Sequence, residues 1–342
     1  MTAENATLVD VAKKAGVALV TASRALNGSG VVAAKTLARI RAAAEQLGYS
    51  PNLSAKVLKG GRTNVLGLLV SDLQSPVITE IIGAVGESVR RAGLDLLIYN
   101  ATSKLGDPDR QDVSRVLGGI CDGLLLVLPA AKPGSLEGFE TARVPVVLMN
   151  YWRTETSLPT VRGDNYEGAR AAVAHLIALG HERIAFIGGS SFTGQSQERQ
   201  RAYTDALRAA GLPRDKALRF AGDFAQPSGF AAAQALMALP EPPTAIFAAN
   251  DLMAFGAMDA LKAAGLRIPQ DVSIVGFDDI PAAAHVHPRL TTVRQPLAEI
   301  SAQAVEMLLA RLRDDAAPAP QQVELPSALI LRESTGAAPG RG

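Results

Sequence analysis

The first sixty or so residues carry apolar positions at helical spacing, without the alternation typical of a strand. The pattern predicts three short helices, over residues 8–14, 18–26 and 34–47. Thr7 and Asp10 have the spacing of a capping box at the start of the first helix. Two short helices joined by a glycine turn, with a third that completes their core, are the parts of a helix-turn-helix.

Beyond Gly60 and Gly61 the pattern changes to short apolar runs that alternate with amphipathic stretches. Such alternation is typical of buried parallel strands and of the helices that cover them. Seven runs predict strands, at residues 65–70, 94–99, 124–128, 146–149, 183–187, 245–248 and 272–275. Parallel sheets bind ligands at the carboxyl ends of their strands. The polar residues that follow these runs are Ser71, Asp72, Asn150, Asn250, Asp251, Asp278 and Asp279.

The length of 342 residues exceeds a single domain of roughly 100–200 residues, so two or three cores are expected. A hydrophobic share of 48% with 20% charged residues is typical of an ordinary globular protein. No apolar run approaches the roughly 20 residues that cross a bilayer. The N-terminal residues also lack the pattern of a signal peptide, so we expect a cytoplasmic protein. The single cysteine, Cys121, precedes an apolar run and is expected to be buried rather than catalytic.

Charge is distributed unevenly along the chain. Residues 1–62 contain nine Lys and Arg against three Asp and Glu, a net charge of +6. The remaining 280 residues contain 25 against 30, a net charge of −5. The basic segment suits a polyanion such as DNA, and a solvated basic face is the alternative interpretation.

Two motifs near the N-terminus, TLVDVAKKAGV at residues 7–17 and TASRALNG at residues 21–28, closely resemble the headpiece of the lactose/galactose-repressor (LacI/GalR) family. Residues 47–52 and the stretch to residue 63 resemble that family's exit from the third helix and its hinge. Three later segments are similar to its effector domain, at residues 179–189, 248–254 and 275–279. The resemblance covers residues 7–335, which is nearly the whole chain.

The resemblance implies an α/β fold class with an all-helical helix-turn-helix headpiece over residues 1–50 and a hinge helix and linker over residues 51–62. Residues 63–335 would form a periplasmic-binding-protein-like domain with parallel sheets, which binds the effector and dimerises. Its N-subdomain would comprise residues 63–162 and 292–325, and its C-subdomain residues 163–291 and 326–335. Residues 336–342 are expected to be a loose tail.

In this family the second helix lies in the major groove, where each base pair presents a distinct pattern. By position, Leu19, Val20 and Arg24 would face bases, and Arg24 can bond two acceptors of one guanine. The residues expected at phosphates or supporting these contacts are Thr7, Thr21, Ser23, Asn27, Tyr49 and Asn52. The alternatives are that Leu19 and Val20 belong to the core and that Arg24 is a solvated charge. The family's capping side chains are absent at Ala18 and Ala33, so both helix starts lose an acceptor.

The hinge over residues 51–59 begins with proline and precedes two glycines, a pattern that allows roughly two helical turns, too few for a stable isolated helix. In the family this segment orders on DNA, pairs with its dimer mate and inserts a leucine into the minor groove. Leu58 occupies that position, and Ala55 lies beside it. The alternative is a linker helix whose Leu58 packs on its own domain.

Sugar-binding members of the family hold hydroxyl groups in the cleft between two subdomains. The matching residues here are Asn150, Arg199, Asn250 and Asp278, with Phe224 as a stacking platform and Ser71, Asp72 and Ser75 on the opposite wall. Planar polar groups can each bond two hydroxyls, and a ring face can cover the C–H side of a sugar. Val77 and Ile78 replace an aromatic pair of the purine-binding members, which argues against a nucleobase. Each polar residue could instead be a turn or capping residue.

An enzyme, a cofactor and a metal site are not expected. Asp278 and Asp279 are adjacent at a strand end and point in opposite directions, so they are poorly placed as an acid/base pair. His285 and His287 lack a third ligand nearby. A sugar kinase would need a nucleotide-binding motif, which is absent. A secreted sugar-binding protein with the same effector fold would need a signal peptide and no basic headpiece.

These observations together predict a transcription regulator, most simply a repressor, that responds to a sugar or sugar derivative. Its expected partners are pseudo-palindromic double-stranded operator DNA, the small-molecule effector and a second copy of the chain, with no membrane partner. Two half-sites require a symmetric dimer. The residues after Thr335 contain no leucine heptad, so a homodimer is expected rather than a tetramer.

Overall fold

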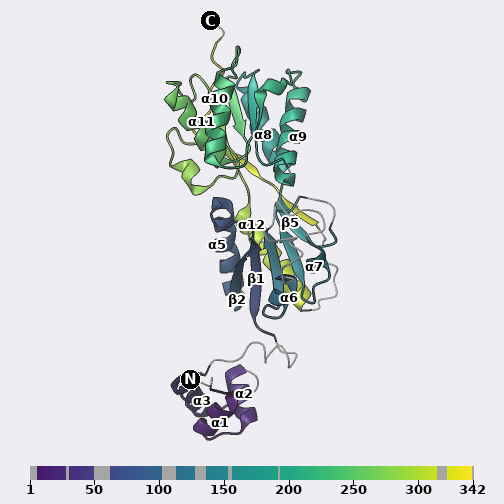
Figure 1. Cartoon of the computed structure of the whole chain (residues 1–342), viewed down its shortest axis with the longest axis vertical. Coiled ribbons are helices and arrows are strands. Elements are labelled where there is room, and N and C mark those ends of the chain that lie inside the picture. Colours follow the sequence, from purple (N-terminus) through teal and green to yellow (C-terminus); the bar gives the residue numbers. More distant parts are fainter. Residues whose placement is uncertain are drawn as a thin grey trace. The chain divides into compact units, whose positions relative to one another are not determined.

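The computed structural model describes residues 6–27, 31–49, 62–101, 113–127, 136–152, 156–191, 193–313 and 322–340. The chain divides into two compact units, Met1–Thr63 and Asn64–Gly342. The described residues of the first unit form three helices, whereas the second unit contains sheets and helices (Figure 1). Within the described residues, no helix is both long enough and apolar enough to cross a bilayer.

The first unit packs three helices, α1 (Leu8–Ala15), α2 (Leu19–Asn27) and α3 (Ala34–Gln46), around one small core. All three lie within one or two residues of the predicted helices. Small side chains dominate the core, which lets the short helices approach closely. The buried residues are Val11, Ala12, Ala15, Ala22, Ala25, Ile40, Ala43 and Ala44.

The ends of these helices differ in how they are capped. The predicted capping box is present at α1, where Thr7 Oγ1 accepts from the Asp10 amide and the Asp10 carboxylate accepts from the Thr7 amide. Gly16 ends α1 with φ of 62°, a left-handed conformation that suits glycine. Ala33 precedes α3 without a side-chain hydrogen bond, so the expected loss of a cap is confirmed there.

The larger sheet has six parallel strands in the order β11-β5-β4-β3-β1-β2. Helices α5 (Pro76–Arg91) and α12 (Leu297–Leu312) pack on one face, while α6 (Val113–Gly118) and α7 (Glu137–Glu140) pack on the other. The strands are β1 (Val65–Val70), β2 (Asp95–Asn100), β3 (Gly123–Val127), β4 (Val146–Met149), β5 (Thr160–Gly163) and β11 (Gln322–Leu325).

The smaller sheet has four parallel strands in the order β7-β6-β8-β9. Helix α8 packs beside α9, and α10 packs beside α11 (Figure 1). Three aromatic rings, of Phe186, Phe247 and Phe277, fill the core. The elements are β6 (Ile184–Gly188), β7 (Arg219–Ala221), β8 (Ala245–Ala248), β9 (Ser273–Val275), α8 (Asn165–Ala178), α9 (Gly194–Ala209), α10 (Gln226–Met237), α11 (Asp251–Ala263) and the short 3₁₀ helices η1 (Lys216–Leu218) and η2 (Pro281–Ala284).

The chain passes between the two sheets three times: from β5 to α8, from β10 (Thr292–Arg294) to α12, and from β11 to β12 (Ala328–Ile330). Strands β10 and β12 pair antiparallel, and bridges join Thr291 to Val275 and Arg294 to Asp278. Residues 292–294, which we expected in the subdomain of the larger sheet, are therefore bonded to β12 and to the segment that follows β9.

The expected fold class, parallel sheets covered by helices, is confirmed. Each of the seven apolar runs coincides with a strand or differs from it by one residue at one or both ends. The sequence pattern does not predict β5, β7, β10, β11 or β12, which have three or four residues each. Strands β7 and β11 lie at sheet edges and alternate between exposed and half-buried positions, so they form no continuous apolar run.

The expectation of a loose tail over residues 336–342 is wrong for its first part. The Gly336 amide donates to Ser273 Oγ at 3.0 Å, and the Ala338 amide donates to the Leu179 carbonyl at 2.9 Å. The imidazole of His181, itself buried, lies 3.1 Å from the Gly336 carbonyl. Backbone groups make these contacts, so a Gly- and Ala-rich composition gave no sign of them.

Cys121 is buried in the core beside the larger sheet, as predicted. Burial raises the pKa of its thiol to about 11. The thiolate is the reactive form of cysteine, so this residue acts as a small apolar side chain.

Candidate functional site

An apolar pair is exposed at the start of α2. Leu19 and Val20 are 46% and 60% exposed, and Arg24, one turn after Val20, is also exposed. Ala22 and Ala25 supply the buried face of the same helix. The alternative that Leu19 and Val20 are core residues of this unit therefore does not hold. Apolar side chains next to an arginine match the thymine methyl groups and guanine acceptors of the major groove.

The other residues expected at DNA are less uniformly exposed. Thr21 and Ser23 are half-buried on α2, and Tyr49 packs partly buried against the core. Thr7 is exposed, and its hydroxyl donates to Asp10 Oδ2 at 2.6 Å, so it also has a capping role. Asn27 is the last residue of α2, and its side chain lies outside the described residues, as do Asn52, Ala55 and Leu58.

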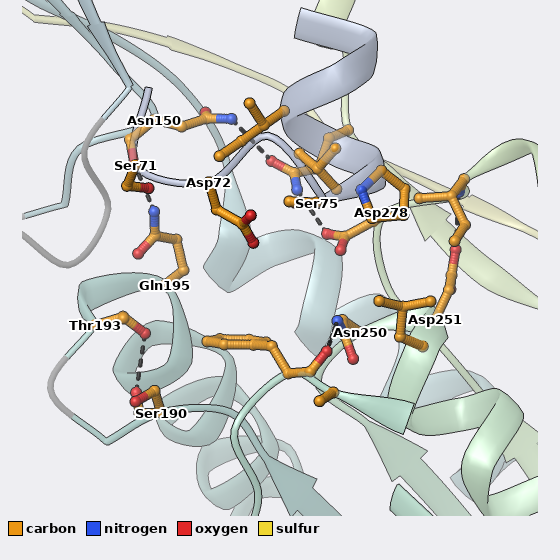
Figure 2. A pocket seen from close by; sticks show the side chains of 18 of the residues that line it. Ser71, Asp72, Ser75, Asn150, Ser190, Thr193, Gln195, Asn250, Asp251 and Asp278 are labelled. Carbon is orange, nitrogen blue, oxygen red and sulfur yellow. Dashed lines mark hydrogen bonds between the residues drawn. The ribbon is translucent and has the colours of Figure 1, made fainter. Parts of the chain in front are cut away.

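A cavity of about 550 Å³ in the second unit brings the expected effector residues together. Side chains that follow strands of the larger sheet face side chains that follow strands of the smaller one (Figure 2). Small-molecule sites usually enclose roughly 300–1,000 Å³. All eight expected residues line the cavity: Ser71, Asp72, Ser75, Asn150, Arg199, Phe224, Asn250 and Asp278.

Arg199 and Asp278 form a buried ion pair at this cavity. The Arg199 Nη2 to Asp278 Oδ1 distance is 3.3 Å, and both side chains are less than a tenth exposed. Arg199 also donates to Asn165 Oδ1 at 2.7 Å and to the Ala249 carbonyl, and its guanidinium lies 3.6 Å from the centre of the Phe277 ring. Burial raises the pKa of Asp278, and the charge of Arg199 opposes that rise. These contacts fix the orientation of both side chains before any ligand arrives.

Asn150 connects both sides of the cavity. It is buried and has φ of 50°, and its side-chain oxygen accepts from the Gly163 amide. Gln195, at the start of α9, donates to the Asn150 carbonyl at 2.6 Å. Gln295, between β10 and α12, donates to Asp278 Oδ1 at 2.7 Å and lies 3.5 Å from the Asn150 amide nitrogen. A polar network therefore runs from the larger sheet, through a crossover, to Asp278.

Asn250 has a structural task in addition to its place in the cavity wall. Its side-chain oxygen caps α11 by accepting from the Met253 amide, and its amide nitrogen donates to the Phe224 carbonyl, both at 2.9 Å. The capping alternative raised from the sequence is thus observed for Asn250. Asp72 similarly accepts from the Gln74 amide at 2.8 Å.

Phe224 depends on a neighbouring glycine for its position. The Phe224 backbone has φ of 70°, and its ring covers Gly189 so closely that a Cβ atom there would lie 2.1 Å from the ring. A side chain at residue 189 would displace the ring. Gly189 therefore keeps an aromatic face beside the cavity.

Three further carboxylates surround Asp278. Asp251 is fully buried, and its carboxylate accepts from Thr292 Oγ1 at 2.5 Å and from the Ile280 amide at 2.9 Å. Burial raises the pKa of Asp251 well above the usual range, and the charge of Asp278 raises it further. Asp279 pairs with Arg294 and Arg332. Glu80, on α5, has a buried oxygen without a partner among the described residues, and burial raises its pKa, with Asp278 next in effect.

Asp278 and Asp279 have separate sets of partners, so the expectation that they do not act as a pair agrees with this arrangement. Among the described residues, no group of three or more His, Cys, Asp or Glu side chains is placed to hold a metal ion.

Several cavity residues were not predicted from the sequence. Gln195 and Thr193 begin a helix rather than follow a strand, and Gln295 lies in a crossover, so the rule of polar residues at strand ends misses them. Asp223 follows β7, an edge strand that the apolar pattern also misses. Asp251 was noted at a strand end, but its complete burial could not be read from its position.

Two family models match the chain in separate regions. Bacterial regulatory proteins of the lacI family match residues 7–52, and the periplasmic binding protein-like domain matches residues 173–335. The HTH-type transcriptional repressor PurR of Actinobacillus pleuropneumoniae serotype 3 (strain JL03) is 33% identical over 330 residues, which cover 96% of this chain and 98% of that relative.

Solved structures of transcriptional regulators are also similar to this chain over nearly its whole length. The transcriptional regulator CelR–cellobiose complex is 33% identical with a TM-score of 0.73, over 96% of this chain and 99% of that one. The lac repressor dimer bound to operator and the anti-inducer ONPF is 28% identical with a TM-score of 0.84, over 98% of this chain and 100% of that one.

Proposed function

Because the chain belongs to the lacI family of bacterial regulatory proteins and is a DNA-binding transcriptional repressor rather than an enzyme, we propose that a sugar controls its affinity for operator DNA. One observation carries this proposal. The eight residues that the sequence predicts as sugar contacts line one cavity of about 550 Å³.

The chemistry of the cavity wall supports a sugar as the effector. Amide, carboxylate and hydroxyl groups stand on both sides, and the Phe224 ring can cover an apolar C–H face. Val77 lines the cavity where the purine-binding members of the family use an aromatic residue, which leaves no ring to stack on a nucleobase from that wall. CelR, similar over almost its whole length, is described in complex with cellobiose.

For the DNA side we propose that α2 enters the major groove with Leu19, Val20 and Arg24 at the bases. The exposure of these three side chains supports this role, since a core function would bury them. Thr21, Ser23 and Asn27 would contact phosphates, supported by Thr7, Tyr49 and Asn52. Leu58 would act as the minor-groove wedge with Ala55 beside it. The active form would be a homodimer in the cytoplasm, because two half-sites need two headpieces.

Coupling between the two functions would run through the crossovers. A sugar held by Asn150 and Asp278 would replace or strengthen the bonds that Gln295 makes to them, and so favour one arrangement of the two subdomains. A ligand shifts such an equilibrium only by its difference in affinity for the two states, typically ~1–3 kcal/mol. The hinge over residues 51–59 would respond to that shift.

The test measures sugar binding to the full chain and the effect of that sugar on operator affinity. Thermal unfolding of the full chain with a panel of mono- and disaccharides should show selective stabilisation by one or a few of them, since a ligand raises apparent stability by mass action. The same sugar should change operator affinity in a gel-shift titration. Stabilisation by adenine, guanine or their nucleosides, and by no sugar, would contradict the proposal.

A further inference from the structure

The cavity has an unusual balance of charge for a site that could hold either neutral or phosphorylated sugars. Four of its described lining residues carry carboxyl groups, Asp72, Asp223, Asp251 and Asp278, and one, Arg199, carries a basic group. Which of these charges a ligand can meet depends on the partners that each already has.

Arg199 is not available to a ligand anion. Its guanidinium donates to Asp278, Asn165 and the Ala249 carbonyl, and it is stacked on Phe277. The side chain is 4% exposed. A phosphate oxygen would have to replace Asp278 at this guanidinium, which would leave a buried carboxylate without its cation. The only basic side chain among the described lining residues is therefore already neutralised.

Asp72 and Asp223 stand on opposite walls, after β1 and β7, and both are exposed towards solvent. Neither forms an ion pair with a described basic residue. Hydrogen bonds from Ser228 and from the Ala225 amide lower the pKa of Asp223, which therefore stays ionised at neutral pH. Two unpaired negative charges thus face any ligand in the cavity.

The N-termini of four helices bring partial positive charge to the cavity, opposite in sign to Asp72 and Asp223. Helices α5, α9, α10 and α11 begin at the cavity, and each N-terminus carries roughly half a positive charge. These ends partly offset the charges of Asp72 and Asp223. Proline in the first turn of α5 and of α10 removes an amide donor from each, and Asn250 already occupies a donor of α11. Among its described lining residues the cavity therefore has no dedicated anion receptor.

Resting on the proposed sugar effector, we propose that this cavity selects uncharged sugars and rejects phosphorylated sugars and sugar acids. A doubly charged phosphate would lose its hydration here without gaining a paired cation, and burying a charge without a partner is strongly unfavourable. Hydroxyl groups, by contrast, can accept from amides and donate to Asp72 and Asp223.

The test uses matched pairs of probes on the full chain, with isothermal titration and thermal unfolding as readouts. The pairs are glucose with glucose 6-phosphate, cellobiose with cellobiose 6-phosphate, and glucose with glucuronate. For the sugar that binds, the phosphorylated or acidic partner should bind on the order of 100-fold more weakly, the loss expected for an unpaired buried charge.

Two substitutions tie the selection to named side chains. Asp72→Asn and Asp223→Asn each keep the side-chain oxygen that accepts from the Gln74 or Ala225 amide, so the local turns are retained. Combined, they should shrink the ratio of neutral to phosphorylated affinity by about tenfold, because two repulsive charges are removed. Asp95→Asn removes one charge at an exposed position outside the cavity and should leave the ratio unchanged.

The outcomes separate the two proposals. A phosphorylated sugar that binds as tightly as its neutral partner overturns the charge selection and leaves the sugar effector standing. An unchanged ratio in the double variant overturns the roles of Asp72 and Asp223. If no sugar of either kind binds, the proposed function fails, and the selection among sugars fails with it.

Discussion

The exposed surface of α2 and the proposed effector cavity use their side chains in opposite ways. Leu19, Val20 and Arg24 stand exposed on a helix whose other face completes a small core. Arg199, Asp278 and Asn150 are buried; Arg199 donates to Asp278, and Gln295 links Asp278 to Asn150. Side chains of the first kind can be changed singly, with little effect on folding. Those of the second kind form a network, in which removal of one member leaves others unpaired.

This difference has a consequence for stability. Exposed positions usually shift the free energy of unfolding by less than ~0.5 kcal/mol when substituted. A buried pair that loses one partner costs roughly 3–5 kcal/mol. At the proposed DNA surface of α2, substitutions should therefore change binding without changing folding, whereas in the cavity they should change both.

Deletion of residues 1–62 should have the largest effect. It removes α1 to α3 and the net charge of +6, so operator binding should be abolished, while effector affinity stays nearly unchanged because every described cavity residue lies beyond residue 62. Filter binding and isothermal titration measure the two quantities. Specific operator affinity retained by the shortened chain would refute the assignment of the headpiece.

Asp278→Ala should have the next largest effect, because it leaves Arg199 buried without its carboxylate and Gln295 without its acceptor. We expect the free energy of unfolding to fall by roughly 3–5 kcal/mol and the response to effector to be lost. Operator binding at a temperature where the variant is folded should persist.

Asp278→Asn is the matched variant for that experiment, since it keeps an acceptor for Gln295 and Arg199. It should lose less stability than Asp278→Ala in urea unfolding. A full effector response in both variants would mean that the ligand is held elsewhere.

Leu58→Ala tests the hinge, which lies outside the described residues. Loss of an inserted leucine should weaken operator binding by roughly 1.5–3 kcal/mol, the free energy of burying one such side chain. Effector affinity should be unchanged in a calorimetric titration. Operator affinity equal to that of the unmodified chain would leave the hinge as a tether only.

Arg24→Ala should cost ~1–3 kcal/mol of operator affinity and relax the preference at one base pair, with almost no change in thermal unfolding. Selection from a randomised operator library measures the preference. Arg41→Ala, an exposed basic residue on α3, is the control for charge alone. A uniform loss across all sequences in the Arg24 variant would place this side chain at a phosphate.

Many of the helix ends and strands could be predicted from the sequence, because each depends on residues that are adjacent in the chain. The capping box at Thr7, the glycine at residue 16 and the continuous apolar runs of β1, β4 and β8 each follow from adjacent residues. The strand-end rule, together with the family resemblance, also brought all eight expected residues to one cavity.

The features that escaped prediction depend on contacts between distant segments. Gln295 gains its place from a crossover that pairs β10 with β12, and Gln195 from the approach of α9 to the end of β4. The position of residues 336–338 depends on hydrogen bonds from the Gly336 and Ala338 amides to Ser273 Oγ and the Leu179 carbonyl. No local sequence pattern predicts these contacts, because the partners are separated by tens of residues.

The smallest expected effect concerns the uncapped start of α3. Ala33 has φ of −55° and ψ of 138°, an extended conformation from which a serine hydroxyl could accept from an amide of the first turn. Ala33→Ser should therefore stabilise this helix by ~0.5–1 kcal/mol. Hydrogen exchange of the α3 amides in the full chain resolves this local change.

Ala38→Ser, at an exposed position within the same helix, is the matched control and should destabilise it by roughly 0.5 kcal/mol, because serine is a poorer helix former than alanine. Equal effects of the two substitutions would show that the end of α3 is satisfied without a side chain. Opposite signs, with operator affinity nearly constant in both variants, would show that the headpiece can be stabilised without changing how it reads DNA.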